Sequence, residues 1–264
     1  MKNFKFLLIS VIIIYGAYFL VDTKTENNIQ DLNIIPIHVD DVENIVKRES
    51  KEKNVRAIKS KLPKELINSG LIQLLKPPED RELEYVWSEE YGCFDDELED
   101  SCKYDFLNAK SVIEARWMKN NGYPTKSMLD LVNNPNYKNQ IKVLARSKYP
   151  AALTIASIEA MKLGNYREAA HLALSNIAYS DKSKTYPHVL YGEALVLDEK
   201  TIAGVTQLFI AGLLGDYMAN GRAIGLTPDV AYTTATINSA HNYLKNIFGL
   251  NVPVDPRPMG DDGG

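Results

Sequence analysis

The chain has 264 residues, of which 45% are apolar and 24% are charged, and its formal net charge is −4. This length and apolar content are sufficient for one or two domains with a sizeable core. The slightly acidic balance, without a basic patch or interleaved basic and aromatic residues, argues against nucleic acid as a partner.

The first 21 residues, MKNFKFLLISVIIIYGAYFLV, combine a basic start with a long uncharged run from Phe6 to Val21. As a helix this run spans about 24 Å, and a start at Phe4 with a snorkelling Lys5 brings it close to the roughly 30 Å of a bilayer core. We therefore expect a signal anchor in residues 1–21, with membrane contact through residues 4–21. The basic end stays in the cytoplasm, which puts the body on the extracytoplasmic, periplasmic side of the cell membrane.

A cleaved signal peptide is the alternative, and it would give a secreted or soluble periplasmic protein. The best cleavage position follows Ala17, but Tyr15 stands where a small residue is needed. Beyond this segment we expect a polar tether over residues 22–54, a helical body over 55–250 and a disordered, Pro/Gly-rich tail over 251–264.

Cys93 and Cys102 are the only cysteines of the chain, and CFDDELEDSC places five carboxylates between them. An even cysteine count in an exported protein predicts a disulfide bond, which removes roughly 2.7 kcal/mol of chain entropy from the unfolded state. The spacing is not C-x-x-C, no histidine lies nearby for zinc, and the glycine of a calcium-binding EF-hand loop is missing. We expect an acidic loop closed by a disulfide, without a metal.

The rest of the chain shows helical spacing of apolar residues and no sustained alternation. Three Tyr-Pro pairs, ending at Pro124, Pro150 and Pro187, mark helix starts, because proline suits the first turn. The stretch EDRELEYVWSEEYG (79–92) also has helical spacing. Predicted helices in the remainder cover 105–119, 125–133, 137–147, 150–163, 166–179, 187–198, 201–219 and 228–248. The expected fold is all-α, with the anchor helix followed by a stack of α-helical hairpins or an irregular helical bundle.

A shift of 34 residues superposes MKLGNYREAAHL (161–172) on LVLDEKTIAGVT (195–206), and aligns Ala169 with Ala203. LGNYREAA resembles the middle of a tetratricopeptide (TPR) repeat, and residues 150–214 as a whole resemble a divergent TPR or Sel1-like helical-repeat protein. Ser157 and Asp181 depart from the pattern, and the second unit lacks the Gly-x-Tyr turn. A plain helical bundle is the alternative. The resemblance implies a partner groove lined by Thr154, Ile158, Met161 and His188.

The sequence contains no G-x-S-x-G, H-E-x-x-H, phosphate-binding glycine loop or dinucleotide fingerprint, and we assign no catalytic residue, cofactor or metal ligand. Glu114 and Glu159 stand on otherwise apolar helical faces. A single helix-borne glutamate is the general acid of lytic transglycosylases, which makes an exported peptidoglycan-acting enzyme one alternative. The other interpretation is an ion-paired or solvated glutamate.

These observations together predict a membrane-anchored helical-repeat protein of the cell envelope that binds a protein or peptide partner on the concave face of its stack. An inhibitor or immunity-type protein of the periplasm is a further alternative.

Overall fold

The computed structural model describes residues 70–92 and 107–258, all within one compact unit spanning Val46–Gly264. Its elements are helices, and the described ranges contain no β-strand, which confirms the all-α prediction for this part of the chain. The predicted anchor, tether and disulfide loop lie outside the described residues. The helices are α5 (Gly70–Leu74), α6 (Asp80–Tyr91), α8 (Val112–Asn120), α9 (Lys126–Asp130), the 3₁₀ turn η2 (Leu131–Asn133), α10 (Lys138–Arg146), α11 (Pro150–Lys162), α12 (Tyr166–Tyr179), α13 (Thr185–Leu197), α14 (Thr201–Leu214), α15 (Tyr217–Gly225) and α16 (Val230–Phe248).

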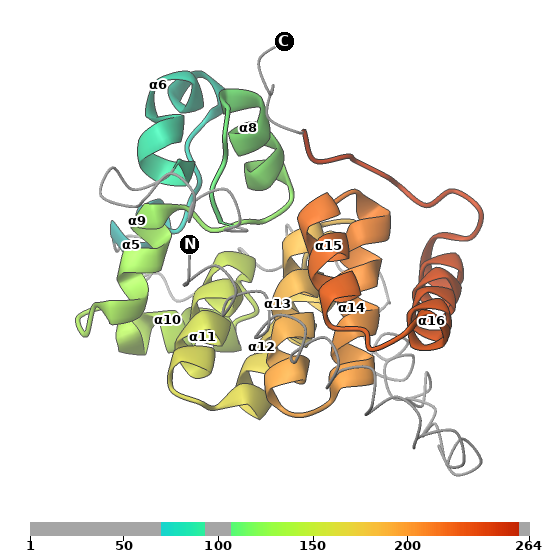
Figure 1. Cartoon of the computed structure of the whole chain (residues 1–264). Helices are drawn as coiled ribbons and strands as arrows, with labels where there is room; N and C mark the ends of the chain where they lie inside the picture. Colours follow the sequence, from blue (N-terminus) through green and yellow to red (C-terminus); the bar gives the residue numbers. More distant parts are fainter. Residues whose placement is uncertain (1–69, 93–106, 259–264) are drawn as a thin grey trace, which may run out of the picture. The chain divides into compact units, whose positions relative to one another are not determined.

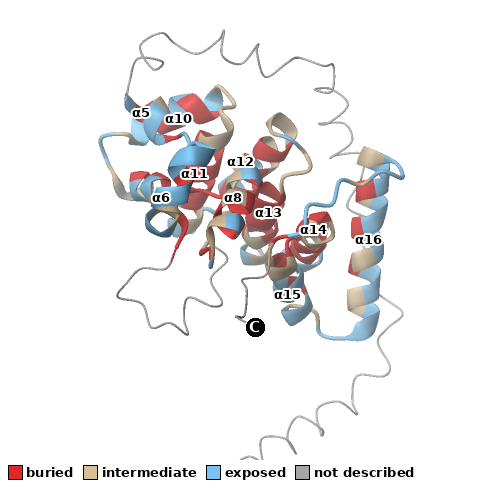
Figure 2. Ribbon diagram, turned by 90° about the horizontal axis from the view of Figure 1, so that it is seen from above, coloured by how far each residue is buried: buried red, intermediate tan, exposed pale blue. Residues whose placement is uncertain are grey.

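Consecutive helices pack against one another from α10 to α14, and the connections between them are short (Figure 1). Short connections make neighbouring helices antiparallel. Helix α14 is largely enclosed, because it contacts α13, α15 and α16, and Figure 2 shows most of its residues as buried. These packed helix pairs are compatible with a helical-repeat fold. Among the described residues, no helix combines the length and the apolar character needed to cross a membrane.

Two consecutive helix pairs, α11–α12 and α13–α14, repeat with an offset of 35 residues, because both their first and their second helices start 35 residues apart. The turns repeat with the same offset. Gly164 and Glu199 both have positive φ, at 74° and 60°, and each follows a helix end closed by the same pair of backbone hydrogen bonds. The alignment at 34 residues was therefore wrong by one position.

The corrected offset identifies the small residues at which paired helices cross. In the first pair, the Ser157 hydroxyl donates to the carbonyl oxygen of Ala169 at 2.8 Å. The equivalent residues 35 positions on are Gly192 and Gly204, and a Cβ built on Gly204 would lie 2.7 Å from the carbonyl oxygen of Gly192. Gly204, and not the predicted Ala203, is the counterpart of Ala169, since only a glycine allows this approach.

The predicted helix over 201–219 is also two helices. Helix α14 ends at Leu214, Gly215 has a φ of 127°, and the Asp216 side chain accepts hydrogen bonds from the backbone N–H groups of Met218 and Ala219 to begin α15. A Gly-Asp pair that supplies an unusual backbone angle and then a helix cap ends one helix and starts another.

The C-terminal arm (residues 251–258) differs from the disorder that its composition predicts. It leaves α16 and runs back to the end of α14 and to α8 (Figure 1), where Arg257 is only 3% exposed. Val252, Asp255 and Arg257 each precede a proline. Residues in that position are restricted to extended conformations, so the arm loses little entropy when it is fixed.

Candidate functional site: a groove at helix N-termini and the ion cluster beside it

A groove with a volume of about 230 Å³ lies where the N-terminal ends of α11 and α13 meet the loop between α8 and α9. Pro124, Pro150 and Pro187 line it, together with Pro77 from the segment before α6. Three of these four prolines belong to the Tyr-Pro pairs that mark helix starts in the sequence. Helices α11 and α13 are the first helices of successive hairpins, so their N-termini lie at the same end of the stack.

All of the charged residues that line the groove are lysines: Lys76, Lys119 and Lys184. Lys119 forms an ion pair with Asp80, with 2.7 Å between Nζ and Oδ1. Within the described part of the chain, Lys76 and Lys184 have no carboxylate within ion-pair distance. The charged lining of the groove is therefore positive, although Asp181 lies near Lys184: hydrogen bonds from Ser183 and the Lys184 charge lower the pKa of Asp181.

The start of α11 adds to the positive potential of the groove. Helix α11 starts with Pro150, and no side chain caps its N-terminus. An uncapped N-terminus carries a partial positive charge on its free N–H groups. In α13 the first two N–H groups donate to Asn121, at 3.4 Å to its side-chain oxygen and 3.2 Å to its carbonyl oxygen, whereas Ala151 in the first turn of α11 lines the groove.

Buried polar side chains also line the groove. Asn176 is 1% exposed, and its Nδ2 donates to the Thr154 hydroxyl at 2.8 Å. Asn176 Oδ1 and Ser180 Oγ have no hydrogen-bond partner among the described residues. Unsatisfied buried polar atoms are rare and costly, and they often mark a place where a ligand or water binds.

The structure separates the four residues that the TPR resemblance placed in one partner groove. Thr154 lines the groove described above. Ile158 is 8% exposed and belongs to the core, and Met161 is half-buried against it. His188 is 1% exposed, with Nδ1 2.9 Å from Gln207 Oε1. Of the four residues, only Thr154 lines this groove, so they do not lie together on one surface as the resemblance implied.

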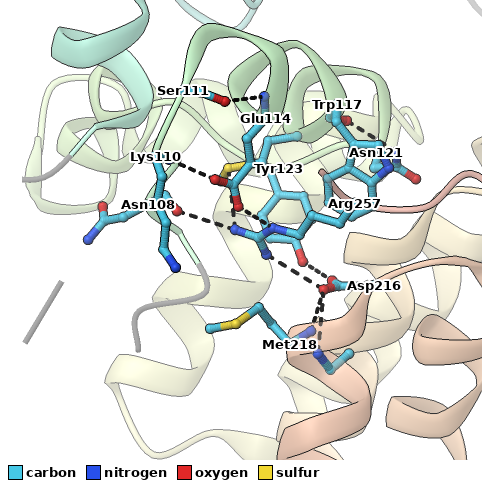
Figure 3. Close-up of polar contacts among 12 residues, drawn as sticks. Asn108, Lys110, Ser111, Glu114, Trp117, Asn121, Tyr123, Asp216, Met218 and Arg257 are labelled. Atoms are coloured by element: carbon cyan, nitrogen blue, oxygen red, sulfur yellow. Dashed lines mark hydrogen bonds and ion pairs between the residues drawn. The ribbon is translucent and has the colours of Figure 1, made fainter. Parts of the chain in front are cut away.

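Beside the groove, Arg257 of the C-terminal arm is enclosed in a buried ion cluster (Figure 3). Its Nε donates to Glu114 Oε1 at 2.7 Å, its Nη1 lies 3.6 Å from Asp216 Oδ1, and its Nη2 donates to the carbonyl oxygen of Asn108 at 3.2 Å. The guanidinium also lies 5.4 Å from the ring centres of both Trp117 and Tyr123. Such contacts with aromatic rings stabilise a cation.

Both carboxylates of the ion cluster accept further hydrogen bonds besides their contact with Arg257. Glu114 accepts a second hydrogen bond from the backbone N–H of Lys110 at 2.7 Å, and Asp216 accepts from the hydroxyl of Tyr123. Burial raises the pKa of Asp216, while the Arg257 guanidinium opposes that shift. Burial and the neighbouring Asp216 carboxylate raise the pKa of the Tyr123 hydroxyl well above its usual value, which keeps it a hydrogen-bond donor.

Glu114 and Glu159 do not have the free, exposed carboxyl groups that a general acid of a lytic enzyme would need. Glu114 is 1% exposed and bound to Arg257, and the Glu159 side chain forms an ion pair with Lys138 at 2.6 Å. Both are ion-paired glutamates, which is the second of the two interpretations that the sequence left open. Neither lines the groove.

Tyr123 and Asn121 connect the ion cluster to the groove. Tyr123 lines the groove, and its ring centre is 4.5 Å from that of Tyr186 at the start of α13. Asn121 Nδ2 donates to Asp255 of the arm at 3.1 Å, while the same residue binds the first N–H groups of α13. The arm therefore fixes one wall of the groove.

The comparisons with known proteins add no family assignment, because no family model, curated protein or solved structure matches the chain.

Proposed function

We propose that this protein is a binding module of the cell envelope, which holds a segment of another protein in the groove at the N-termini of α11 and α13. The observation that carries the proposal is the groove itself, which combines apolar walls, positive charge and unsatisfied buried polar atoms. Ligand sites are typically concave and largely apolar, with a few polar groups that fix orientation.

We also propose that the protein is anchored in the cell membrane and that its body is a divergent helical-repeat stack. The anchor over residues 4–21 would hold the body at the outer side of the membrane, and the polar segment 22–54 would give the groove reach. The packed hairpins with a 35-residue offset support a divergent TPR-like or Sel1-like stack, because such repeats pair helices in this way and bind peptides or proteins.

The proposal is tested by site-specific photo-crosslinking in cells that express the full chain. A photoreactive amino acid is introduced at Tyr149 or Lys184 in the groove, and at His171 or Ile224 as exposed controls away from it. We expect discrete protein adducts from the groove positions and none from the controls. Equal adducts from all four positions, or adducts from the controls alone, would contradict the proposal.

A further inference from the structure

The charges and hydrogen-bonding groups of the groove narrow the chemistry of its ligand, and this inference rests on the proposed function. We infer that the groove binds an extended peptide segment that carries at least one acidic side chain. The charge evidence is the set of lining lysines, of which Lys76 and Lys184 form no ion pair with a carboxylate of the described residues. A carboxylate bound there gains a charge-assisted hydrogen bond.

The start of α11 supplies a second, independent attraction for a carboxylate. The helix has 13 residues and no side-chain cap, and Ala151 in its first turn lines the groove. Because Pro150 has no N–H, the first free donor of the helix at the groove is the N–H group of Ala151. Donors at an uncapped helix N-terminus favour an anion.

The unsatisfied polar atoms distinguish a peptide from a small anion. Asn176 Oδ1 is a hydrogen-bond acceptor without a partner in the described ranges, so a ligand that carries a donor can satisfy it. A carboxylate or a phosphate ester has no N–H to give, whereas an extended peptide backbone presents one at every residue except proline. Ser180 Oγ, also without a partner there, can serve as a second contact.

The apolar lining agrees with a peptide as well. Leu75, Tyr149 and Pro187 belong to walls whose exposed area is mostly carbon. Proline and tyrosine rings are rigid, so they lose little entropy when a side chain packs on them. A phosphate or a lipid headgroup would leave these surfaces without a partner.

The test is selection of random twelve-residue peptides displayed on phage against the full chain in detergent micelles, followed by affinity measurement with synthetic copies of the enriched peptides. We expect the enriched peptides to share aspartate or glutamate. Lys184→Glu should weaken their binding by about fivefold or more, since it replaces an attraction with a repulsion at close range. The matched control is Lys142→Glu, which reverses an exposed charge on α10 outside the groove and should leave the affinity unchanged.

The outcomes separate this inference from the proposed function. Enriched peptides without acidic residues, whose binding is still lost when Ala151 is changed to Trp to fill the groove, would overturn the acidic ligand and leave the groove as a binding site. Displacement of an acidic peptide by millimolar inorganic phosphate, with no effect from millimolar acetate, would assign the site to phosphate and overturn the inference. A dimer that Lys184→Glu dissociates in sedimentation would show that a second copy occupies the groove, which also overturns it. Failure to enrich any peptide would count against both proposals.

Discussion

Removal of the Arg257 charge should strongly destabilise the folded protein. Arg257→Met keeps most of the side-chain volume but leaves two carboxylates, Glu114 and Asp216, buried at 1% and 0% exposure without their cation. Breaking a buried ion pair in this way costs about 3–5 kcal/mol. For a chain of this size, that lowers the melting temperature by about 6–20 °C.

The assay is thermal and urea unfolding of the full-length protein, with Arg222→Ala as the control. Arg222 also binds a carboxylate, with 2.9 Å from its Nε to Glu193 Oε1, but the side chains of this pair are 43% and 24% exposed. Its loss should cost less than about 1 kcal/mol. Neutralising both acids in the Arg257→Met background, as Glu114→Gln with Asp216→Asn, should restore part of the loss, because no uncompensated charge remains buried.

Removal of the whole arm should have the same effect as loss of Arg257. A stop codon after Leu250 removes Arg257 together with Asp255, which accepts hydrogen bonds from Trp117 and Asn121. The truncated chain should therefore be at least as unstable as Arg257→Met. If Arg257→Met melts within 2 °C of the unchanged protein, the ion cluster does not hold the arm and the argument is refuted.

Other predictions address the buried histidine, the helix crossing and the segments that precede the described body. Burial lowers the pKa of His188, so its protonation favours the unfolded state. The free energy of unfolding should therefore fall as the pH drops below about 6.5, and it should fall less steeply in His188→Gln. An equal pH slope in His188→Gln and in the exposed control His171→Gln would contradict this. Gly204→Ala should destabilise the protein by about 1–3 kcal/mol, because its Cβ would meet backbone atoms. Gly221→Ala in the open middle of α15 should stabilise it by about 0.5–1 kcal/mol. Urea unfolding measures both changes, and free-energy changes of the same sign would show that the helix crossing is not at Gly204. Under non-reducing conditions Cys93 and Cys102 should resist alkylation, and labelling of either thiol would exclude the bridge. The full chain should stay with membranes after a salt wash, and release of a shortened form would indicate cleavage instead of anchoring.

Helix positions were largely predictable from the sequence because they depend on local signals. The helix over Tyr166–Tyr179 has the predicted bounds, and the one beginning at Pro150 starts where the Tyr-Pro pair indicates. Proline position and the 3.6-residue spacing of apolar side chains act within one or two turns, so they can be read without knowledge of the fold.

Register was not predictable to the residue. Small residues are frequent in both helix pairs, so Ala203 and Gly204 are equally plausible counterparts of Ala169 by pattern alone. The choice depends on which residue the partner helix approaches, and only Gly204 meets the carbonyl oxygen of Gly192. In the turn of the second helix pair, Glu199 has positive φ where the first pair has a glycine. The sequence of that turn therefore does not reveal that the offset is 35 residues and not 34.

The arm and the ion cluster depend on contacts that the sequence cannot reveal. Arg257 binds Glu114, which lies 143 positions earlier in the chain. A segment rich in proline reads as disordered when its partners are unknown, although the same prolines make it a stiff extended arm. The location of the groove was partly predictable, because Pro124, Pro150 and Pro187, which line it, lie within two residues of helix starts.

The most direct measurement of the central claim is the NMR signal of the Asn176 side-chain amide in the full chain, recorded with and without a saturating amount of a selected acidic peptide. Asn176 lines the groove and its Oδ1 has no partner in the described part of the chain, whereas Asn165, an exposed residue before α12, serves as the reference. The account predicts that the Asn176 amide signals shift as the peptide binds and that those of Asn165 stay in place. A bound peptide that leaves the Asn176 signals unchanged would place the ligand elsewhere on the molecule and contradict the account.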